Sequence, residues 1–183
     1  MPRFYTGAGD AGYSGLIGGS KLPKSGEIFE AIGSVDELNS AIGVAITNST
    51  DEHLGDMLQN VQNKLFIIGA ELASVAHGGA MPAKSIDKES VTDLERGIEE
   101  LSSGLPELKK FVLPGGSVSG SYLHLARAVC RRAERSVIRA GTGEKPIANP
   151  EAVRYLNRLS SFLFVAALYI NRKEGVEEQN PTY

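Results

Sequence analysis

Half of the arginines in this chain lie within one short stretch, and their spacing places them on one side of a helix. Five of the ten fall between Arg127 and Arg139. Arg127 and Arg131 are four residues apart and Glu134 follows three later, so the three side chains share a helical face. A guanidinium group presents paired planar donors that suit phosphate and carboxylate. The stretch therefore indicates an anion-binding face, although an exposed face of salt bridges with the chain's own acids remains the alternative.

A second candidate for anion binding is the glycine-rich segment at residues 5–26. Gly7, Gly9 and Gly12 match the spacing G-x-G-x-x-G of dinucleotide-binding folds. Only six residues precede this match, so no strand can lead into it and the dinucleotide-binding interpretation fails. What remains is a loop whose backbone amides can wrap an anion such as phosphate. An unstructured N-terminal tail is the alternative interpretation.

The other reactive side chains give no independent sign of a metal or redox site. His53, His77 and His124 do not form the Glu-x-x-His pairs that di-iron bundles use, and we expect surface or packing roles for them. Cys130 is the only cysteine, which excludes an internal disulfide and a four-ligand zinc site. We interpret Cys130 as a buried packing residue.

Three further polar or aromatic residues have an ordinary structural interpretation. Asn157 and Ser161 lie four apart in a mainly apolar helical pattern, where a polar residue usually makes a core hydrogen bond. Phe111 precedes a Leu-Pro-Gly-Gly turn at 113–116 and, taken alone, is expected to cap the core.

Helical periodicity dominates the chain from about residue 30 onward. A capping-box spacing places the first helix start at Ser34, with Glu37 three residues later. Further helices are predicted at about 51–76, over 91–101, at about 118–140, and from the cap Asn149-Pro150 to Ile170. No segment alternates polar and apolar side chains over a useful length. The pattern predicts an all-α fold, an antiparallel five-helix bundle with a four-helix-bundle-like core and a glycine-rich N-terminal loop.

Composition restricts the class of protein. The chain has 183 residues, 42% of them hydrophobic, and a formal net charge of −3. This length suffices for one domain with a buried core, and the composition is too apolar for a disordered chain. Nucleic-acid binding is disfavoured because it needs a basic face. The first residues lack the apolar core of a signal peptide, and no apolar run reaches the roughly 18 residues that cross a bilayer, so we expect a cytoplasmic location.

Taken together, these features resemble the PduO-type cob(I)alamin adenosyltransferase family. The similarity lies in blocks that follow the family's order and span nearly the whole chain. They are YTGAGDAG at 5–12, AIGSVDELNS at 31–40, FVLPGG at 111–116, RAVCRRAER at 127–135, and RYLNRLS at 154–160 followed by FLF at 162–164. No single block is specific, but their combination is.

The resemblance implies one domain over residues 1–183, with a nucleotide-binding loop segment at 1–26 and a helical bundle at 30–175. It further implies a homotrimer with active sites between subunits. ATP with Mg²⁺ is then the co-substrate and cob(I)alamin the substrate: the 5′-deoxyadenosyl group moves to cobalt, triphosphate leaves, and adenosylcobalamin forms. A cobalamin reductase and an enzyme that uses adenosylcobalamin are candidate partners, whereas nucleic acid and membrane are not.

The resemblance also assigns roles at the nucleotide. Arg131 and Arg135 meet the phosphates, while Glu134 and Asn157 orient the nucleoside and the metal. The residues that close over the phosphates from the adjacent subunit are Thr6, Gly7, Ala8, Gly9, Ser14, Gly15 and Lys24.

At the corrinoid, the resemblance assigns three residues. Asp36 and Arg127 correspond to an acid and a base paired across the subunit interface. Phe111 corresponds to the aromatic side chain beneath the corrin ring, which displaces the lower axial base and so makes Co(II) easier to reduce. These three residues and Arg131 are the ones expected to be catalytic.

Three positions depart from the family's usual pattern. Gly7 and Ala11 stand where lysines are usual, and Ile28 stands where arginine is frequent. The loop that grips triphosphate loses two positive charges, while Lys24 keeps its family position and Lys21 is nearby. These departures raise an alternative function, a carrier or sensor of cobalamin or ATP with the same fold and little transferase activity. A purely structural bundle would leave the loop and the arginine face unexplained.

Overall fold

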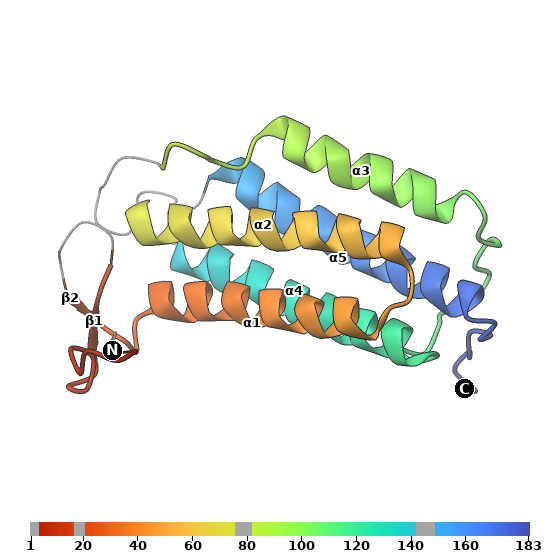
Figure 1. Ribbon diagram of the computed structural model, residues 1–183, viewed down its shortest axis with the longest axis horizontal. Helices are drawn as coiled ribbons and strands as arrows, with labels where there is room; N and C mark the ends of the chain where they lie inside the picture. The colour runs from red at the N-terminus through yellow and green to blue at the C-terminus, as the bar shows by residue number, and fades with distance from the viewer. Residues whose placement is uncertain (1–3, 17–20, 76–81, 142–148) are drawn as a thin grey trace.

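The computed structural model describes residues 4–16, 21–75, 82–141 and 149–183, where it shows five helices and one small hairpin (Figure 1). The helices are α1 (Glu27–Asn48), α2 (Glu52–Val75), α3 (Lys88–Ser102), α4 (Val118–Ala140) and α5 (Pro150–Lys173). The strands β1 (Tyr13–Gly15) and β2 (Lys21–Pro23) pair antiparallel beside the end of the bundle where α1 begins. The predicted all-α class with a five-helix bundle is confirmed, and the hairpin is an addition to it.

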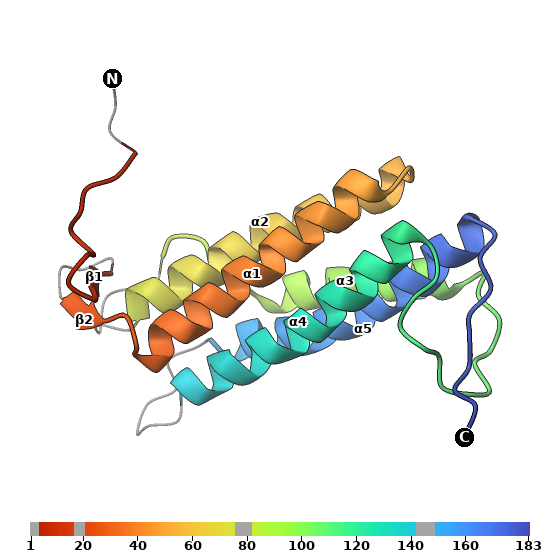
Figure 2. The same ribbon diagram turned by 90° about the horizontal axis from the view of Figure 1, so that it is seen from below.

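The five helices pack into a bundle, and α4 lies between two other helices. Helix α1 lies against α2 and α4, α4 lies against α5, and α5 lies against α3. These neighbours run antiparallel except α3 and α5, which lie side by side in the same direction (Figures 1 and 2). Helix α4 thus has a neighbour on each of two sides, and its remaining face is open to other contacts.

Each helix turns a stripe of apolar side chains inward. On α2 these residues recur at spacings of three and four, as a bundle helix requires. They are Leu54, Leu58, Val61, Leu65, Ile68 and Leu72, all buried. On α4 the buried side consists largely of small residues such as Ala126, Ala133 and Ala140, which let neighbouring helices approach closely. No helix in the described ranges is long and apolar enough to cross a membrane.

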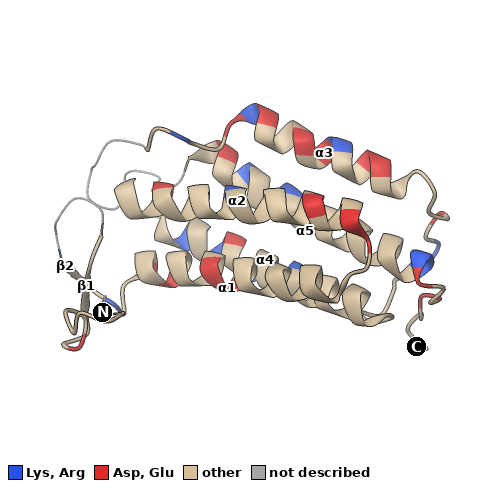
Figure 3. Ribbon diagram, in the orientation of Figure 1, with Lys and Arg blue, Asp and Glu red and all other residues tan. Residues whose placement is uncertain are grey.

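Helix α3 packs mainly against α5 and carries charges of both signs along its length (Figure 3). Its apolar stripe contains the buried residues Val91, Leu94 and Leu101. At its surface, Glu95 Oε1 accepts a hydrogen bond from Arg158 Nε of α5 at 3.0 Å. An apolar stripe and a surface ion pair therefore hold α3 to its neighbour.

The predicted helix start at Ser34 is wrong, because α1 begins earlier, at Glu27. A carboxylate in the first turn is favoured by the helix dipole, and this signal lies before the capping-box match. Ser34 is buried within α1, where its hydroxyl donates to Ser136 Oγ of α4 at 3.3 Å. Glu37 Oε1 lies 2.6 Å from Arg132 Nη2, also on α4. Both residues of the apparent capping box thus join α1 to α4.

The other helix ends agree with the sequence pattern where the structure describes them. The Asn149 side chain accepts from the Glu151 N–H, and Pro150 occupies the first turn of α5, as predicted. Ser117 caps α4 in the same way. The predicted loop residues His77, Gly78 and Gly79 lie outside the described residues.

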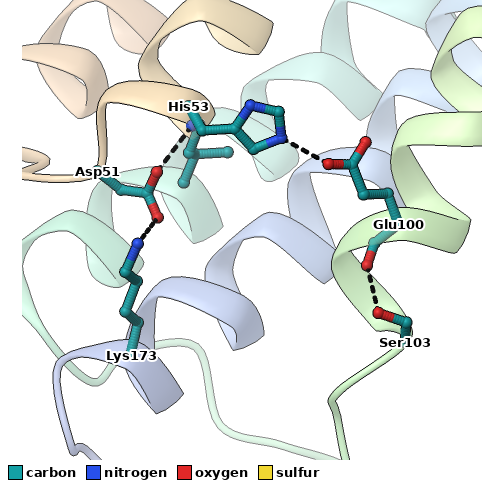
Figure 4. A network of polar contacts seen from close by, with 6 residues as sticks. Asp51, His53, Glu100, Ser103 and Lys173 are labelled. Carbon is teal, nitrogen blue, oxygen red and sulfur yellow. Dashed lines mark hydrogen bonds and ion pairs between the residues drawn. The ribbon is translucent and has the colours of Figure 1, made fainter.

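Polar contacts tie together the end of the bundle where α3 leads toward α4 (Figure 4). Asp51 accepts from the Leu54 N–H at 2.9 Å and lies 2.6 Å from Lys173 Nζ of α5. His53 Nε2 lies 2.6 Å from Glu100 Oε1 of α3. Burial acts to raise the pKa of Asp51, but the hydrogen bonds from Leu54 and Lys173 help bring the pKa below its usual value. The ends of α2, α3 and α5 are therefore held in register.

Asn171 of α5 holds the loop that leads into α4. Its Oδ1 accepts from the Ser117 N–H and Oγ, each at 2.9 Å. Its Nδ2 donates to the Gly115 carbonyl and to Glu178 Oε1, each at 3.0 Å. A Cβ at Gly116 would lie 2.2 Å from Nδ2, and the backbone there has a φ of +109°, so only glycine suits the position. One buried amide thus fixes the loop before α4.

We expect Asn171→Ala to lower the free energy of unfolding by about 2–4 kcal/mol, because it leaves the buried Ser117 and the partly buried Gly115 carbonyl without this partner. Asn63→Ala, the same change at an exposed position of α2, is the control and should alter stability by about 0.5 kcal/mol or less. Urea unfolding followed by circular dichroism measures both. Equal stabilities for the two variants would contradict the role given to Asn171.

Candidate active site

A cleft of about 760 Å³, called the Phe111 cleft below, opens between α4, α5 and the segment 108–112. Arg127 and Arg131 line it from α4, and Phe111 lines it from the segment with 79% of its surface exposed. The structure therefore brings together three of the residues predicted to be catalytic. Phe111 lies on the surface, so its interpretation as a cap on the core is wrong.

Arg127 presents a buried nitrogen to this site without a partner. Its guanidinium carbon lies 5.9 Å from the centre of the Phe164 ring, a cation–π contact. Its Nε is buried and has no hydrogen-bond partner among the described residues. Asp36 is exposed on α1 and makes no ion pair with Arg127 within the described part of this chain. Because Arg127 lines the cleft and makes no ion pair within the described residues, its guanidinium group suits an anionic partner from outside the chain.

The histidine and cysteine near this site have the packing roles that we expected. His124 is 3% exposed, and its ring meets Phe164 edge-on at 6.0 Å. Burial, and then the positive charge of Arg127, lower the pKa of His124, so it is neutral at pH 7. Cys130 is buried, its Sγ lies 3.3 Å from the Leu156 carbonyl, and burial raises the pKa of its thiol. The predictions of packing for His124 and Cys130 are confirmed.

A row of polar residues on α4, called the polar row, consists of Arg131, Glu134 and Arg135. It continues beyond the cleft toward the hairpin end of the bundle. Asn157 Nδ2 of α5 donates to Glu134 Oε1 at 2.9 Å, and Arg135 Nη1 donates to the Arg131 carbonyl at 2.9 Å. Asn157 is exposed, so the interpretation of this residue as a core hydrogen bond is wrong. Ser161 is exposed as well and lines the Phe111 cleft.

The arginine face was interpreted either as an anion-binding face or as an exposed face of salt bridges, and each interpretation holds for some of its arginines. Arg132 forms an ion pair with Glu37, as an exposed salt-bridged face would. The side chains of Arg127 and Arg131 make no ion pair within the described ranges and line the cleft instead. These ranges contain no group of three His, Cys, Asp or Glu residues that could hold a metal ion. Arg127 and Arg131 therefore suit an anion that enters the cleft.

The N-terminal segment forms a tight, ordered loop rather than an unstructured tail. Gly7 and Gly12 have φ angles of +70° and +81°, and the Thr6 hydroxyl accepts from the Ala8 N–H at 3.3 Å. The Lys24 side chain crosses the loop, since a Cβ at Gly9 would lie 2.8 Å from Lys24 Nζ. The ammonium group of Lys24 thus lies against the loop at Gly9.

One chain does not bring this loop to the Phe111 cleft. The hairpin lies at one end of the bundle and the loop from α3 to α4 lies at the other (Figures 1 and 2). Ser14 and Gly15 lie in β1, and Thr6, Gly7, Ala8 and Gly9 precede it. The described part of this segment makes no hydrogen bond to α4. The predicted phosphate-binding residues therefore form two separate groups within the chain.

Some residues that shape the cleft were missed by sequence reasoning. Ser160, Phe164 and Val165 line it from α5. Because their neighbours in the sequence are apolar, the pattern predicts that this part of α5 is buried in the core. No periodic signal marks the positions that line the cleft. Asn180 donates from Nδ2 to the Phe111 carbonyl at 2.8 Å, and the Leu113 N–H donates to the Gln179 carbonyl at 2.8 Å. Such contacts between distant segments leave no local pattern.

Comparison with known proteins places these features in one family. Residues 4–170 match the model of the family described as cobalamin adenosyltransferase. The chain is 42% identical to the corrinoid adenosyltransferase MMAB of Mus musculus, over 98% of this chain and 77% of the mouse protein. It is 40% identical to the corrinoid adenosyltransferase of Bacillus subtilis, over 95% of this chain and 89% of that protein.

Solved structures agree. A variant of the PduO-type ATP:corrinoid adenosyltransferase from Lactobacillus reuteri, in complex with cobalamin and ATP, superposes with a TM-score of 0.89. It is 34% identical, and the match covers 99% of this chain and 100% of the other. A second variant of that protein, in complex with ATP, gives a TM-score of 0.89 at 33% identity, covering 98% of this chain and 100% of the other. The chain therefore belongs to the cobalamin adenosyltransferase family and is a corrinoid adenosyltransferase, an enzyme that transfers the adenosyl group of ATP to cob(I)alamin.

Proposed function

We propose that this enzyme carries out the transfer in the Phe111 cleft and along the polar row of α4 beside it. The observation that carries the proposal is the meeting of Phe111, Arg127 and Arg131 at one cleft. An exposed aromatic surface suits the flat face of a corrin ring, and the guanidinium groups suit phosphate. The binding of both cobalamin and ATP by the similar Lactobacillus reuteri protein supports the same pair of ligands here.

The reaction asks for alignment and charge stabilisation rather than for a protein nucleophile. Co(I) attacks the C5′ carbon of ATP with its electron pair, the Co–C bond forms, the C5′–O bond breaks, and triphosphate leaves with that bond's electrons. The enzyme must hold the two substrates in line and stabilise the charge of the leaving group. We assign the second task to Arg131 and Arg135, which lie one turn apart on the exposed side of α4.

Magnesium is expected to accompany the nucleotide at Glu134. The Glu134 carboxylate is held by Asn157 at 2.9 Å, and the described residues provide no cage of protein ligands around it. This donor set fits Mg²⁺, which commonly takes one or two carboxylates together with substrate phosphates and water. When bound, the ion would offset negative charge on the triphosphate.

The corrinoid side is assigned to Phe111 and to the pair of Arg127 and Asp36. Phe111 would cover the lower face of the ring and displace the axial base from cobalt. Arg127 lines the cleft without an ion pair among the described residues, which supports a carboxylate partner, and we assign that role to Asp36 of an adjacent subunit. Co(I) must be made from Co(II) by an electron donor, so a reductase has to act before the transfer.

A homotrimer would complete the site from two chains. Within one chain the N-terminal loop lies at the opposite end of the bundle from the Phe111 segment (Figure 2). Thr6, Ser14 and Lys24 would then close over phosphates that are held by a neighbour's arginines. The separation within the chain and the open face of α4 support this arrangement.

We expect Arg131→Ala to lower kcat for transfer by about 10²–10³-fold, the usual effect of removing one donor to a developing charge. The measurement is an anaerobic assay with ATP, magnesium and chemically reduced cobalamin, followed by the spectral change to adenosylcobalamin. Arg132→Ala is the matched control, since that arginine pairs with Glu37 and should be nearly neutral. Full activity of Arg131→Ala would refute the assignment to phosphate.

Phe111→Ala should slow transfer to cobalamin more than transfer to cobinamide, which lacks the lower base. The reason is that only cobalamin needs a side chain to displace that base. Leu113→Ala, a truncation in the same loop and outside the cleft lining, should treat the two substrates alike. If Phe111→Ala reduced both rates equally, displacement of the base would not be its role.

Ala11→Lys should lower the KM for ATP by roughly tenfold, since a charge-assisted hydrogen bond contributes about 1.5–3 kcal/mol. Ala11 is exposed and has an ordinary backbone, whereas a lysine at Gly7 would meet a φ of +70° and strain the loop. Ala11→Met adds length without charge and serves as the control. An unchanged KM for Ala11→Lys would mean that this position does not face the triphosphate.

A further inference from the structure

A second cleft, of about 680 Å³, lies directly beyond the segment that carries Phe111. It opens between residues 105–112 and the segment 175–180 that follows α5. The side chains that line both this second cleft and the Phe111 cleft are Leu108, Lys109, Lys110 and Val112. The Phe111 segment is therefore a thin wall between two adjoining clefts.

The wall is held from the side of the second cleft. Asn180 Nδ2 donates to the Phe111 carbonyl at 2.8 Å, and the Leu113 N–H donates to the Gln179 carbonyl at 2.8 Å. Segment 175–180 thus both borders the second cleft and supports the residue that enters the first. A group seated in the second cleft would lie against the same support.

The lining of the second cleft contains both charged and apolar side chains. Lys109 and Lys110 belong to the wall itself and line both clefts. The apolar side chains confined to the second cleft are Leu105, Pro106, Leu168 and Val176. A ligand that reached over the wall from the Phe111 cleft would find cationic side chains at the wall and apolar side chains among the residues of the second cleft.

We propose that the second cleft receives the lower-ligand arm of the corrinoid after Phe111 has displaced its base from cobalt. This inference rests on the proposed role of Phe111. The arm runs from the corrin ring through a phosphodiester to a ribose and then to an aromatic base. In the second cleft the phosphodiester meets Lys109 and Lys110, and the base packs against Leu105 and Val176. On displacement the Co–N bond breaks, the nitrogen keeps its electron pair, and the oxidation state of cobalt is unchanged.

The charges of the cleft favour an uncharged base at its far end. Glu107, Glu177 and Glu178 line it together with Arg172 and the two wall lysines, so three acidic side chains balance three basic ones. Glu178 is already engaged, since its Oε1 accepts from Asn171 at 3.0 Å. A free nucleoside triphosphate would bring several negative charges to these carboxylates. The balance therefore favours the arm, whose single negative charge stays near the wall.

The test fills the second cleft and compares two corrinoids. Val176→Trp and Leu105→Trp place an indole where the base would lie, and Asn63→Trp adds the same group at an exposed position of α2. Binding of cob(II)alamin and of cob(II)inamide, which lacks the arm, is measured on the full-length, ATP-saturated enzyme without oxygen. The cleft variants should bind cob(II)alamin about tenfold more weakly, the low end for one lost apolar contact in a pocket, and cob(II)inamide as before.

A spectroscopic readout accompanies the binding measurement. The electron paramagnetic resonance spectrum of bound cob(II)alamin separates the base-attached from the base-detached form. The detached fraction should fall in both cleft variants and stay unchanged in Asn63→Trp. Thermal unfolding checks that all three variants fold like the parent.

Several outcomes would overturn the inference. Equal weakening of both corrinoids would mean that the indole disturbs the wall, and no weakening of either would mean that the arm lies elsewhere. In a transfer assay of the same variants at varied ATP, a change confined to the KM for ATP would assign the cleft to free nucleotide. A parent enzyme that transferred the adenosyl group to neither corrinoid would refute the proposed function by itself. The binding comparison would still show whether the arm occupies the second cleft.

Discussion

The close approach of α1 and α4 is the constraint on which the rest of the site depends. Helix α4 must bury one side completely so that its other side can carry Arg127 and Arg131, which make no ion pair within the described residues. It does so with small side chains, and the hydroxyls of Ser34 and Ser136 satisfy each other at 3.3 Å within the contact. A larger residue at either position would push the helices apart. The arginines would then move relative to α5, from which Asn157 orients Glu134.

The sequence predicted those elements whose signals are local. Helix α4 was placed correctly at 118–140, because its apolar period is regular and glycines border it. The start of α1 was misplaced, because Ser34 and Glu37 match a capping box by spacing alone while their contacts lie on another helix. The hairpin was missed because three-residue strands are too short to show alternation. Contacts across the bundle override such local signals.

The candidate site shows the same difference between what local sequence signals predict and what contacts across the fold determine. Residue types and spacing pointed to the arginines of α4, and the family resemblance added Phe111, but neither gave exposure. Asn157 was expected inside the core and lies on the surface. Only the folded chain shows that Arg127 keeps a buried nitrogen free and that Arg132 does not lie free beside it. Within one chain the N-terminal loop and the Phe111 segment lie at opposite ends of the bundle, and no local sequence pattern indicates this separation.

The hydrogen bond between Asn180 and the Phe111 carbonyl joins positions 69 residues apart, with two whole helices between them. Closing so long a stretch has an entropic cost that is recovered only after those helices have packed. We therefore expect docking of the Phe111 segment to be a late event in the folding of this chain. During refolding, helical structure would return first and corrinoid binding afterwards. The helix content of a preparation is consequently a poor measure of the fraction of molecules that can bind the corrinoid.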